Sequence, residues 1–333
     1  MNRLPPNLVL VLGGIALACA ALGPARMEPA WQSPLFRDHP LVGRVFDVRG
    51  GRFVGPAALR SAVQRGKLVL LGETHDNPDH HQLQAELVRA ITAGGRRPAL
   101  AFEMLDPAEQ GAVDAALSGS APTPDDLRRA VDWDRSGWPP FALYRPIFEA
   151  GLSAHLPIVA ANLSSQAARG VLHHGPAALD PAVRDLLARA GPPSPGEAAE
   201  RRQEMEDLHC GQLPEAFLDP MVLAQRARDA QLAESVLRGA TADGAVLITG
   251  AEHARQDRGV GMFLRAGGAT RSEVISVAFR EVDPAARGPE DYRPLPYDFV
   301  VFTPAADRGD PCRGMRPASG PLPEQRASAA EKP

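Results

Sequence analysis

Residues 68–77 read LVLLGETHDN, which is four aliphatic residues followed at once by glycine and a run of polar residues. An unbroken aliphatic run of this length is typical of a strand that is buried on both faces. Residues 79–94 come next, and Leu83, Leu87 and Ile91 recur among them at helical spacing. The stretch therefore predicts a buried strand, a tight turn and a helix, which together make the first half of a βαβ unit.

The same alternation of strand and helix continues along the chain. Further strands are predicted at 98–102, 157–161, 245–249 and 274–278, and further helices at 107–117 and 258–266. Residues 164–240 are mostly helical, with interruptions at prolines 192, 193, 195, 214 and 220. The pattern predicts an α/β fold, with a mainly parallel sheet, flanking helices and an inserted helical cap at about 164–240.

The two ends of the chain differ in composition from the part between them. Residues 1–22 contain an apolar run at 7–22 and are predicted to be a secretory or lipoprotein signal, so we expect export to the periplasm or outer membrane. Residues 23–44 are rich in proline and polar residues and are expected to be a linker. Residues 45–308 are then the folded domain, and residues 309–333 have the composition of a disordered tail.

Three cysteines are too few for a disulfide-rich scaffold or a four-cysteine zinc site. Cys19 ends the sequence Ala-Leu-Ala-Cys, which resembles a bacterial lipobox with its leucine one position out of register. Two outcomes stay open: lipidation of Cys19, which attaches the protein to a membrane, or ordinary cleavage, which releases it. In both cases Cys210 and Cys312 remain as the pair that can form a disulfide in an oxidising compartment.

Length and charge narrow the class of protein. A chain of 333 residues is long enough to bury a large core. It carries 36 basic and 40 acidic side chains, a net charge of −4, and no basic stripe that would neutralise a run of phosphates. The charge balance therefore argues against a nucleic-acid partner.

Polar side chains follow directly after several of the predicted strands. Because the carboxyl ends of parallel strands meet at one edge of a sheet, and ligands bind in the crevice there, we expect these side chains to converge. Two of the strand ends share the pattern Gly-x-x-His, in which glycine permits a tight turn and an imidazole follows. The residues expected at this edge are Glu73, His75, Glu103, Asn162, Glu252 and His253.

Imidazoles and carboxylates in one crevice support more than one chemistry. As catalytic groups, Glu73, His75, Glu103, Glu252 and His253 are suited to general acid and base steps. As ligands, His75, Glu103 and His253 are suited to a divalent metal such as Zn²⁺ or Mn²⁺. A structural role is the third alternative, because polar residues after a strand also cap the helix that follows.

An ordered set of motifs resembles the ChaN family of iron-regulated haem-binding lipoproteins. The resemblance runs from about residue 45 to 303, and the family belongs to a larger group that includes Tiki proteases and erythromycin-esterase-like proteins. The chain departs from the pattern after Asn162-Leu163, where Ser164-Ser165 replaces the expected Pro-Arg. The matching motifs are LGETHDN (71–77), HHQ (80–82), FEM (102–104), WD (133–134), SGWP (136–139), YRPI (144–147), AANL (160–163), HCG (209–211), QRARD (225–229) and GAEHAR (250–255).

The resemblance implies a haem pocket and suggests which residues contact the haem iron and its propionates. Haem ligation in the family involves tyrosine, for which Tyr144 is the candidate here and His209 the second choice. Arg226 and Arg228 lie on the predicted cap, where they either face solvent or meet an anionic group such as a haem propionate. The resemblance also implies a homodimer that holds two stacked haems between its subunits.

Two functions follow from these observations. The leading hypothesis is a haem-binding protein of the cell envelope that serves haem or iron acquisition. The alternative is a metal-dependent hydrolase, a peptidase or esterase, in which a metal held by the paired Gly-x-x-His and glutamate site activates water.

Overall fold

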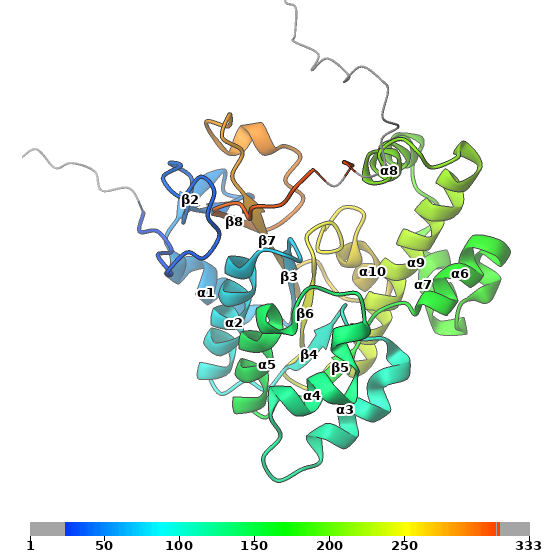
Figure 1. Cartoon of the computed structure of the whole chain (residues 1–333), viewed down its shortest axis with the longest axis horizontal. Helices are drawn as coiled ribbons and strands as arrows, with labels where there is room; N and C mark the ends of the chain where they lie inside the picture. Colours follow the sequence, from blue (N-terminus) through cyan, green and yellow to red (C-terminus); the bar gives the residue numbers. More distant parts are fainter. Residues whose placement is uncertain (1–23, 311, 314–333) are drawn as a thin grey trace, which may run out of the picture.

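The computed structural model describes residues 24–310, 312 and 313 (Figure 1). The predicted signal segment, Cys19 and most of the predicted tail lie outside the described residues. No helix in the described ranges is long and apolar enough to cross a membrane.

A single eight-stranded sheet forms the centre of the protein, with the strand order β2-β1-β8-β7-β3-β6-β4-β5. The strands from β8 to β5 in this order run parallel, and β1 and β2 extend one edge in the antiparallel sense. This confirms the predicted α/β fold with a mainly parallel sheet. The strands are β1 (Val45–Asp47), β2 (Arg52–Val54), β3 (Leu68–Glu73), β4 (Ala99–Phe102), β5 (Ile158–Ala160), β6 (Ala245–Gly250), β7 (Val274–Glu281) and β8 (Phe299–Thr303).

The aliphatic run of β3 divides its side chains between two hydrophobic cores. Val69 and Leu71 pack on one face of the sheet, and Leu68 and Leu70 pack on the other. Every residue of this strand is buried, because helices cover both faces. The first face is covered by α1 (Pro56–Arg65), α2 (Pro78–Ala93), α3 (Gln110–Leu117), α4 (Pro124–Ala130) and α5 (Phe141–Ser153).

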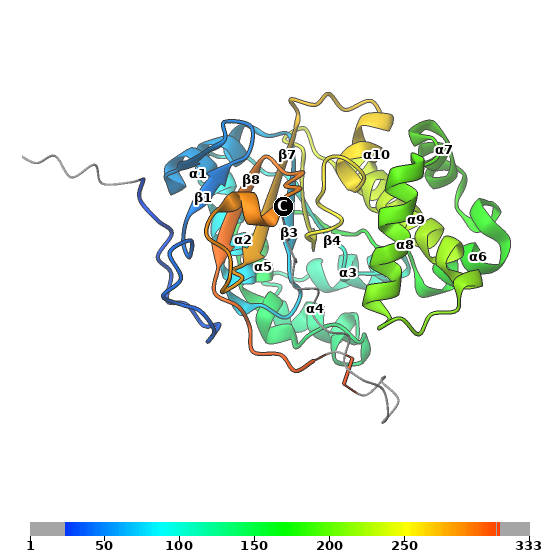
Figure 2. The same ribbon diagram turned by 90° about the horizontal axis from the view of Figure 1, so that it is seen from above.

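The second face of the sheet is covered by the first, second and fourth of the inserted helices and by α10 (Val260–Ala266). Figures 1 and 2 show the inserted helices gathered at the side of the molecule away from β1 and β2. They lie between β5 and β6 in the chain, as the predicted cap requires. The helices are α6 (Ser165–His174), α7 (Pro181–Ala190), α8 (Pro195–Leu208) and α9 (Glu215–Gly239).

Residues 24–44, which were expected to be a linker, lie against the sheet. The amides of Gln32 and Ser33 donate to the Asp79 carboxylate at 2.7 and 3.0 Å, and Leu35 pairs with Ala305. The acceptor Asp79 is itself buried in the first turn of α2. This segment is therefore part of the packed domain in the described structure.

Candidate functional site

The carboxyl ends of β3, β6 and β4 lie side by side and bring the expected polar residues together. Glu73 at the end of β3 pairs with Gly250 at the end of β6, and β4 lies on the other side of β6. A Cβ atom at Gly250 would lie 3.2 Å from His75 Nε2 and 3.7 Å from His253 Cδ2. The two imidazoles therefore both lie next to Gly250, which has no side chain to separate them.

Glu73 is the centre of the first cluster. Its Oε1 accepts hydrogen bonds from His75 Nδ1 at 2.9 Å and from the Tyr144 hydroxyl at 2.8 Å. Its Oε2 lies 3.2 Å from Nδ1 of His81, whose Nε2 donates to the His75 carbonyl at 3.0 Å. The edge of Trp138 packs on the His75 ring, with 5.0 Å between the ring centroids. Only His75 is partly exposed among the three groups that touch this carboxylate.

Glu103 and Asp229 contact the imidazole of His253, the centre of the second cluster, from two sides. His253 Nδ1 donates to Asp229 Oδ1 at 2.7 Å, and its Nε2 lies 3.4 Å from Glu103 Oε1. The other Glu103 oxygen accepts from the Thr249 hydroxyl at 2.6 Å and from the Gly250 amide at 2.8 Å. Asp229 comes from α9, so the cap supplies one of the carboxylates of this cluster.

The pairing of charges decides the protonation of the site. Burial alone would lower the pKa of His75, but the bond to Glu73 and the charges of Glu103 and Glu73 raise it to about 9. Burial by itself would lower the pKa of His253, but the charges of Glu103 and Asp229 outweigh the effect of burial and raise this pKa. Burial would raise the pKa values of Glu73 and Glu103, and the neighbouring imidazoles lower both. His75 is therefore an imidazolium at neutral pH, paired with an ionised carboxylate.

The binding of a metal by His75, Glu103 and His253 stays a prediction. Among the described residues, no group of three His, Cys, Asp or Glu side chains is placed to hold a metal ion. In the described structure these groups contact one another: His75 lies against Glu73, and His253 lies between Asp229 and Glu103. The site is a network of ion pairs in which His75 can donate a proton.

Glu252 was predicted to belong to this catalytic group, and in the structure its carboxylate pairs with arginines instead of with either imidazole. Its side chain is 57% exposed and pairs with Arg255 at 3.3 Å and with Arg258 at 3.1 Å. The turn after β6 directs His253 inward and Glu252 outward, toward the cap. Asn162 uses its side chain locally, since Oδ1 accepts from the Leu163 amide.

Tyr144, the predicted haem ligand, lies in the hydrophobic core. The residue is fully buried, and its hydroxyl donates to Glu73. Burial and the Glu73 charge raise the pKa of the phenol, which disfavours the phenolate that iron would bind. In this structure the hydroxyl contacts the Glu73 carboxylate, and a role of Tyr144 as an iron ligand stays a prediction.

The cap residues expected to contact a cofactor have three different environments. Arg226 is buried and donates to the Gly191 carbonyl and to Glu197, so its charge is already compensated. Arg228 has no carboxylate within 4 Å in the part of the chain that the structure describes, and it donates only to the Gln225 side chain at 3.3 Å. His209 is the C-cap residue of α8 and is half-buried. Its Nδ1 donates to the Met205 carbonyl at 2.7 Å.

A cleft of about 370 Å³ lies between the cap and the strand ends. His253 and Glu252 form its floor on one side, and α8 and α9 form the other wall. Apolar lining comes from Met205, Leu208 and Val222. The cleft therefore joins the second imidazole to an apolar part of the cap.

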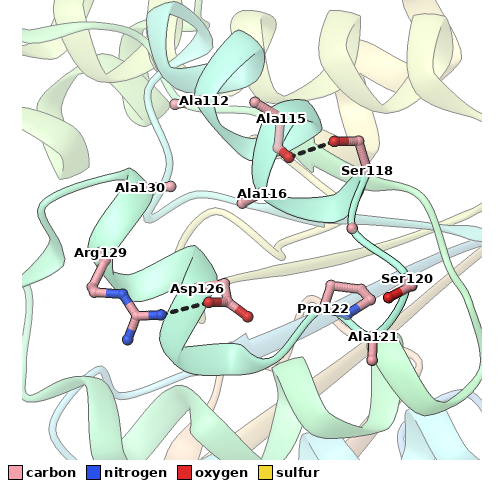
Figure 3. A pocket seen from close by; sticks show the side chains of 11 residues that line it. Ala112, Ala115, Ala116, Ser118, Ser120, Ala121, Pro122, Asp126, Arg129 and Ala130 are labelled. Carbon is pink, nitrogen blue, oxygen red and sulfur yellow. Dashed lines mark hydrogen bonds and ion pairs between the residues drawn. The ribbon is translucent and has the colours of Figure 1, made fainter.

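A larger hollow of about 780 Å³ lies between α3 and α4 (Figure 3). Its lining is mostly small residues, and its charged residues Asp126 and Arg129 are bonded to each other. None of the strand-end residues lines it, so it is not the candidate site.

Three residues of the site were not predicted from the sequence as members of these clusters. His81 and Asp229 complete the two clusters from α2 and α9, and Tyr144 reaches Glu73 from α5. A partial signal exists in the sequence, because the motifs HHQ and QRARD contain His81 and Asp229. Their contacts depend on helix packing, which local patterns do not specify.

Comparisons with solved structures identify the fold. The chain superposes on ChaN of Campylobacter jejuni, a structure described as showing cofacial heme binding, with a TM-score of 0.61 at 17% identity over 77% of this chain and 95% of that one. A weaker likeness is to the type III effector HopBA1, with a TM-score of 0.40 at 13% identity over 74% of this chain and 91% of that one. Another is to the erythromycin esterase EreC in its open conformation, with a TM-score of 0.40 at 16% identity over 78% of this chain and 81% of that one. No curated protein sequence matches the chain.

A family profile gives the remaining comparison. The family described as "Haem-binding uptake, Tiki superfamily, ChaN" matches residues 59–264. The matched region begins in α1, before β3, and ends in α10, so it includes both imidazole clusters and the whole cap. The chain therefore belongs to the ChaN family of the Tiki superfamily.

Proposed function

We propose that this protein binds haem on the hairpin formed by α8 and α9, as an envelope protein that serves haem or iron acquisition. The observation that carries the proposal is an exposed apolar surface at the turn of this hairpin. Leu208 at the end of α8 is 70% exposed, and Phe217 in the first turn of α9 is 49% exposed. A macrocycle is a flat apolar ligand that would cover both side chains.

His209 fits the requirements of an iron ligand at this surface. Its Nδ1 donates to the Met205 carbonyl, which leaves the lone pair on Nε2. The imidazole directly follows Leu208 in the chain and is only half-buried. An apolar surface beside a nitrogen ligand of fixed tautomer is a suitable environment for haem iron.

The cleft beside the hairpin extends the apolar surface toward the domain. Met205 and Val222 line it together with Leu208, and Met205, Leu218 and Val222 form a small hydrophobic cluster between the two helices. Arg228 has no carboxylate partner among the described residues and lies on α9 of the hairpin, so it is the candidate for a propionate. Export, attachment through Cys19 and a homodimer with two haems are further parts of this proposal, supported by the sequence patterns and the family resemblance.

Titration of the purified protein with haemin tests the proposal. We expect a saturable shift of the Soret band with a defined stoichiometry in the wild type. The double substitution Leu208→Ser/Phe217→Ser is expected to weaken binding by about tenfold or more, because it removes the apolar contact. Phe36→Ser is the matched control, since Phe36 is a comparably exposed aromatic side chain of the N-terminal segment, at 41%. Equal affinities for both variants would contradict the assignment of this surface, and no saturable shift in any protein would contradict haem binding itself.

A further inference from the structure

The segment that follows β8 is bound to the loop that carries His75. Arg308 places its guanidinium between two carboxylates and contacts both oxygens of Asp76, at 2.6 and 2.8 Å, and both oxygens of Glu281, at 2.6 and 2.7 Å. The Ala306 amide also donates to Glu281 at 3.0 Å, and the Asn77 side chain donates to the Pro304 carbonyl at 3.1 Å. Residues 304–310 together with Cys312 are called the C-terminal strap below.

The far end of the strap is covalently attached to the cap. Cys312 forms a disulfide with Cys210, which lies in the turn between α8 and α9 and is 102 positions earlier in the chain. Figures 1 and 2 show the strap leaving the side of β8 and ending beside α8. This bond confirms the disulfide expected from the sequence, and it connects the segment after β8 to the turn that carries His209.

The turn of the hairpin has few other connections to the domain. Its backbone hydrogen bonds are local, from His209, Cys210 and Gly211 to the last turn of α8. The apolar cluster of Met205, Leu218 and Val222 is separate from the two large cores. Helix α8 reaches the domain one to two turns earlier, where Arg201 donates to the Arg258 carbonyl at 2.5 Å and Arg258 pairs with Glu204.

We propose that the C-terminal strap is a redox-controlled latch that fixes the α8–α9 turn and thereby the haem-binding surface. When a protein or small-molecule dithiol reduces the disulfide, the S–S bond breaks and two electrons and two protons pass to it. Cys210 and Cys312 then become thiols, and the dithiol becomes a disulfide. The released turn samples more conformations, so ordering it around a ligand costs more free energy and haem binds less tightly. The haem part of this proposal rests on the function proposed above.

Hydrogen exchange of the haem-free protein tests the latch independently of haem. Amides of residues 209–217 and 304–310 are expected to exchange about tenfold faster after reduction with a dithiol, and equally fast in Cys210→Ser/Cys312→Ser, while amides of β3 do not change. Protection of β3 shows that the variant is folded, and the reduced wild type provides the same state without substitution. Unchanged exchange in 209–217 in both would overturn the latch.

The salt bridges of the strap have their own test and control. Arg308→Gln should speed exchange in residues 304–310 while the disulfide remains. Arg271→Gln removes a comparable exposed arginine, paired with Asp298 at 2.6 Å, and should leave the strap unchanged. Equal exchange in the strap for both variants would contradict its attachment through Arg308.

Haemin titration completes the test. After removal of the dithiol under anaerobic conditions, the dissociation constant for haemin is expected to rise about tenfold relative to the oxidised protein. The double serine variant, which offers no thiol to the iron, should show the same rise and no further response to dithiol. Faster exchange with an unchanged dissociation constant would overturn the control of haem binding by the latch. Absence of haemin binding in every state would contradict the proposed function, and the exchange data would still decide whether the latch exists.

Discussion

His75 is the partly exposed member of the Glu73 cluster, and its pKa differs clearly from that of an isolated histidine. Its pKa is raised to about 9, chiefly by Glu73 and Glu103 acting against burial, so the ring is protonated in the folded protein well above its ordinary value of 6.5. The resulting stability is fully present below about pH 6.5 and is lost as the pH rises through about 9. The ion pair is therefore a stabilising element at neutral pH.

The first prediction concerns this proton. NMR titration of the imidazole should give a midpoint near 9 for His75 in the wild type. In Glu73→Gln the midpoint should fall by about one unit or more, because the principal attractive charge is gone. Glu86→Gln is the control, since Glu86 pairs with Arg60 on the surface of α2. The same midpoint in wild type and Glu73→Gln would show that Glu73 does not hold the proton.

The second prediction separates a structural role of Tyr144 from iron ligation. Tyr144→Phe removes the hydroxyl bonded to buried Glu73 and should lower the free energy of unfolding by about 1–3 kcal/mol in a urea titration. Tyr292→Phe, which loses a hydrogen bond from the Asp283 amide at the surface, should cost less. The haemin spectrum should be unchanged in Tyr144→Phe, and loss of the Soret shift would assign Tyr144 as a ligand.

At the scale of the elements, the strand-end site depends on close packing between β3 and the turn after β6. A Cβ atom at Gly72 would lie 2.7 Å from the Ala254 Cβ and 2.8 Å from the Ala251 Cα. Both distances are shorter than ordinary van der Waals contacts, and the Ala251 Cα is a backbone atom that cannot rotate away. The absence of a side chain at this position lets the two strand ends bring His75 and His253 together.

The third prediction follows from this contact. Gly72→Ala should lower the free energy of unfolding by about 1–3 kcal/mol, because the turn has to move. Gly111→Ala in α3 is the matched control, as nothing lies within 4 Å of the added methyl group there. That substitution should stabilise the protein by about 0.5–1 kcal/mol through its helix propensity. Chemical denaturation measures both, and an equally small effect at the two positions would contradict the packing described at Gly72.

Five of the six parallel strands were predicted from the sequence, whereas β8 and the antiparallel strands β1 and β2 were not. β3, β4, β6 and β7 are apolar runs between helical patterns, which is a strong signal for a buried strand. β1 and β2 have three residues each, too few for a periodic pattern, and they form because β1 pairs with β8 and β2 pairs with β1. Helix α5 was missed because Pro146 lies inside it, where the helix forgoes one backbone hydrogen bond and is held by its buried face.

The candidate site was predictable to the extent that strand ends specify it. Glu73, His75, Glu103 and His253 converge because their strands are neighbours, a consequence of the α/β pattern alone. Asp229 approaches from α9, and its contact with His253 depends on how the cap packs. Whether a strand-end histidine is neutral or protonated depends on such partners, so the ion pairs of this site were beyond sequence reasoning.

For the whole molecule, the Cys210–Cys312 bond closes a covalent loop that includes β6, β7 and β8. The fourth prediction is that its reduction lowers the free energy of unfolding by about 2–5 kcal/mol, because the unfolded chain regains the conformations that the closed loop excludes. Urea titration with and without dithiol measures the change. Cys210→Ser/Cys312→Ser should match the reduced wild type and show no response to dithiol, and a dithiol effect that persists in this variant would assign the change to another cause.

The cap connects the separate parts of the molecule. It supplies Asp229 to the strand-end site, His209 and the apolar turn to the proposed haem surface, and Cys210 to the strap. A change at the turn of the hairpin therefore acts on the haem surface first, while the imidazole clusters remain supported by the sheet.

Haemin titration of His209→Ala, followed by absorption spectroscopy, tests the central proposal most directly. We expect the variant to lose the wild-type iron spectrum and to bind haemin about tenfold or more weakly, since the nitrogen ligand is gone. His174→Ala, at the exposed end of α6, should retain the wild-type spectrum and affinity. A wild-type spectrum and affinity in His209→Ala would contradict the assignment of haem to the α8–α9 hairpin.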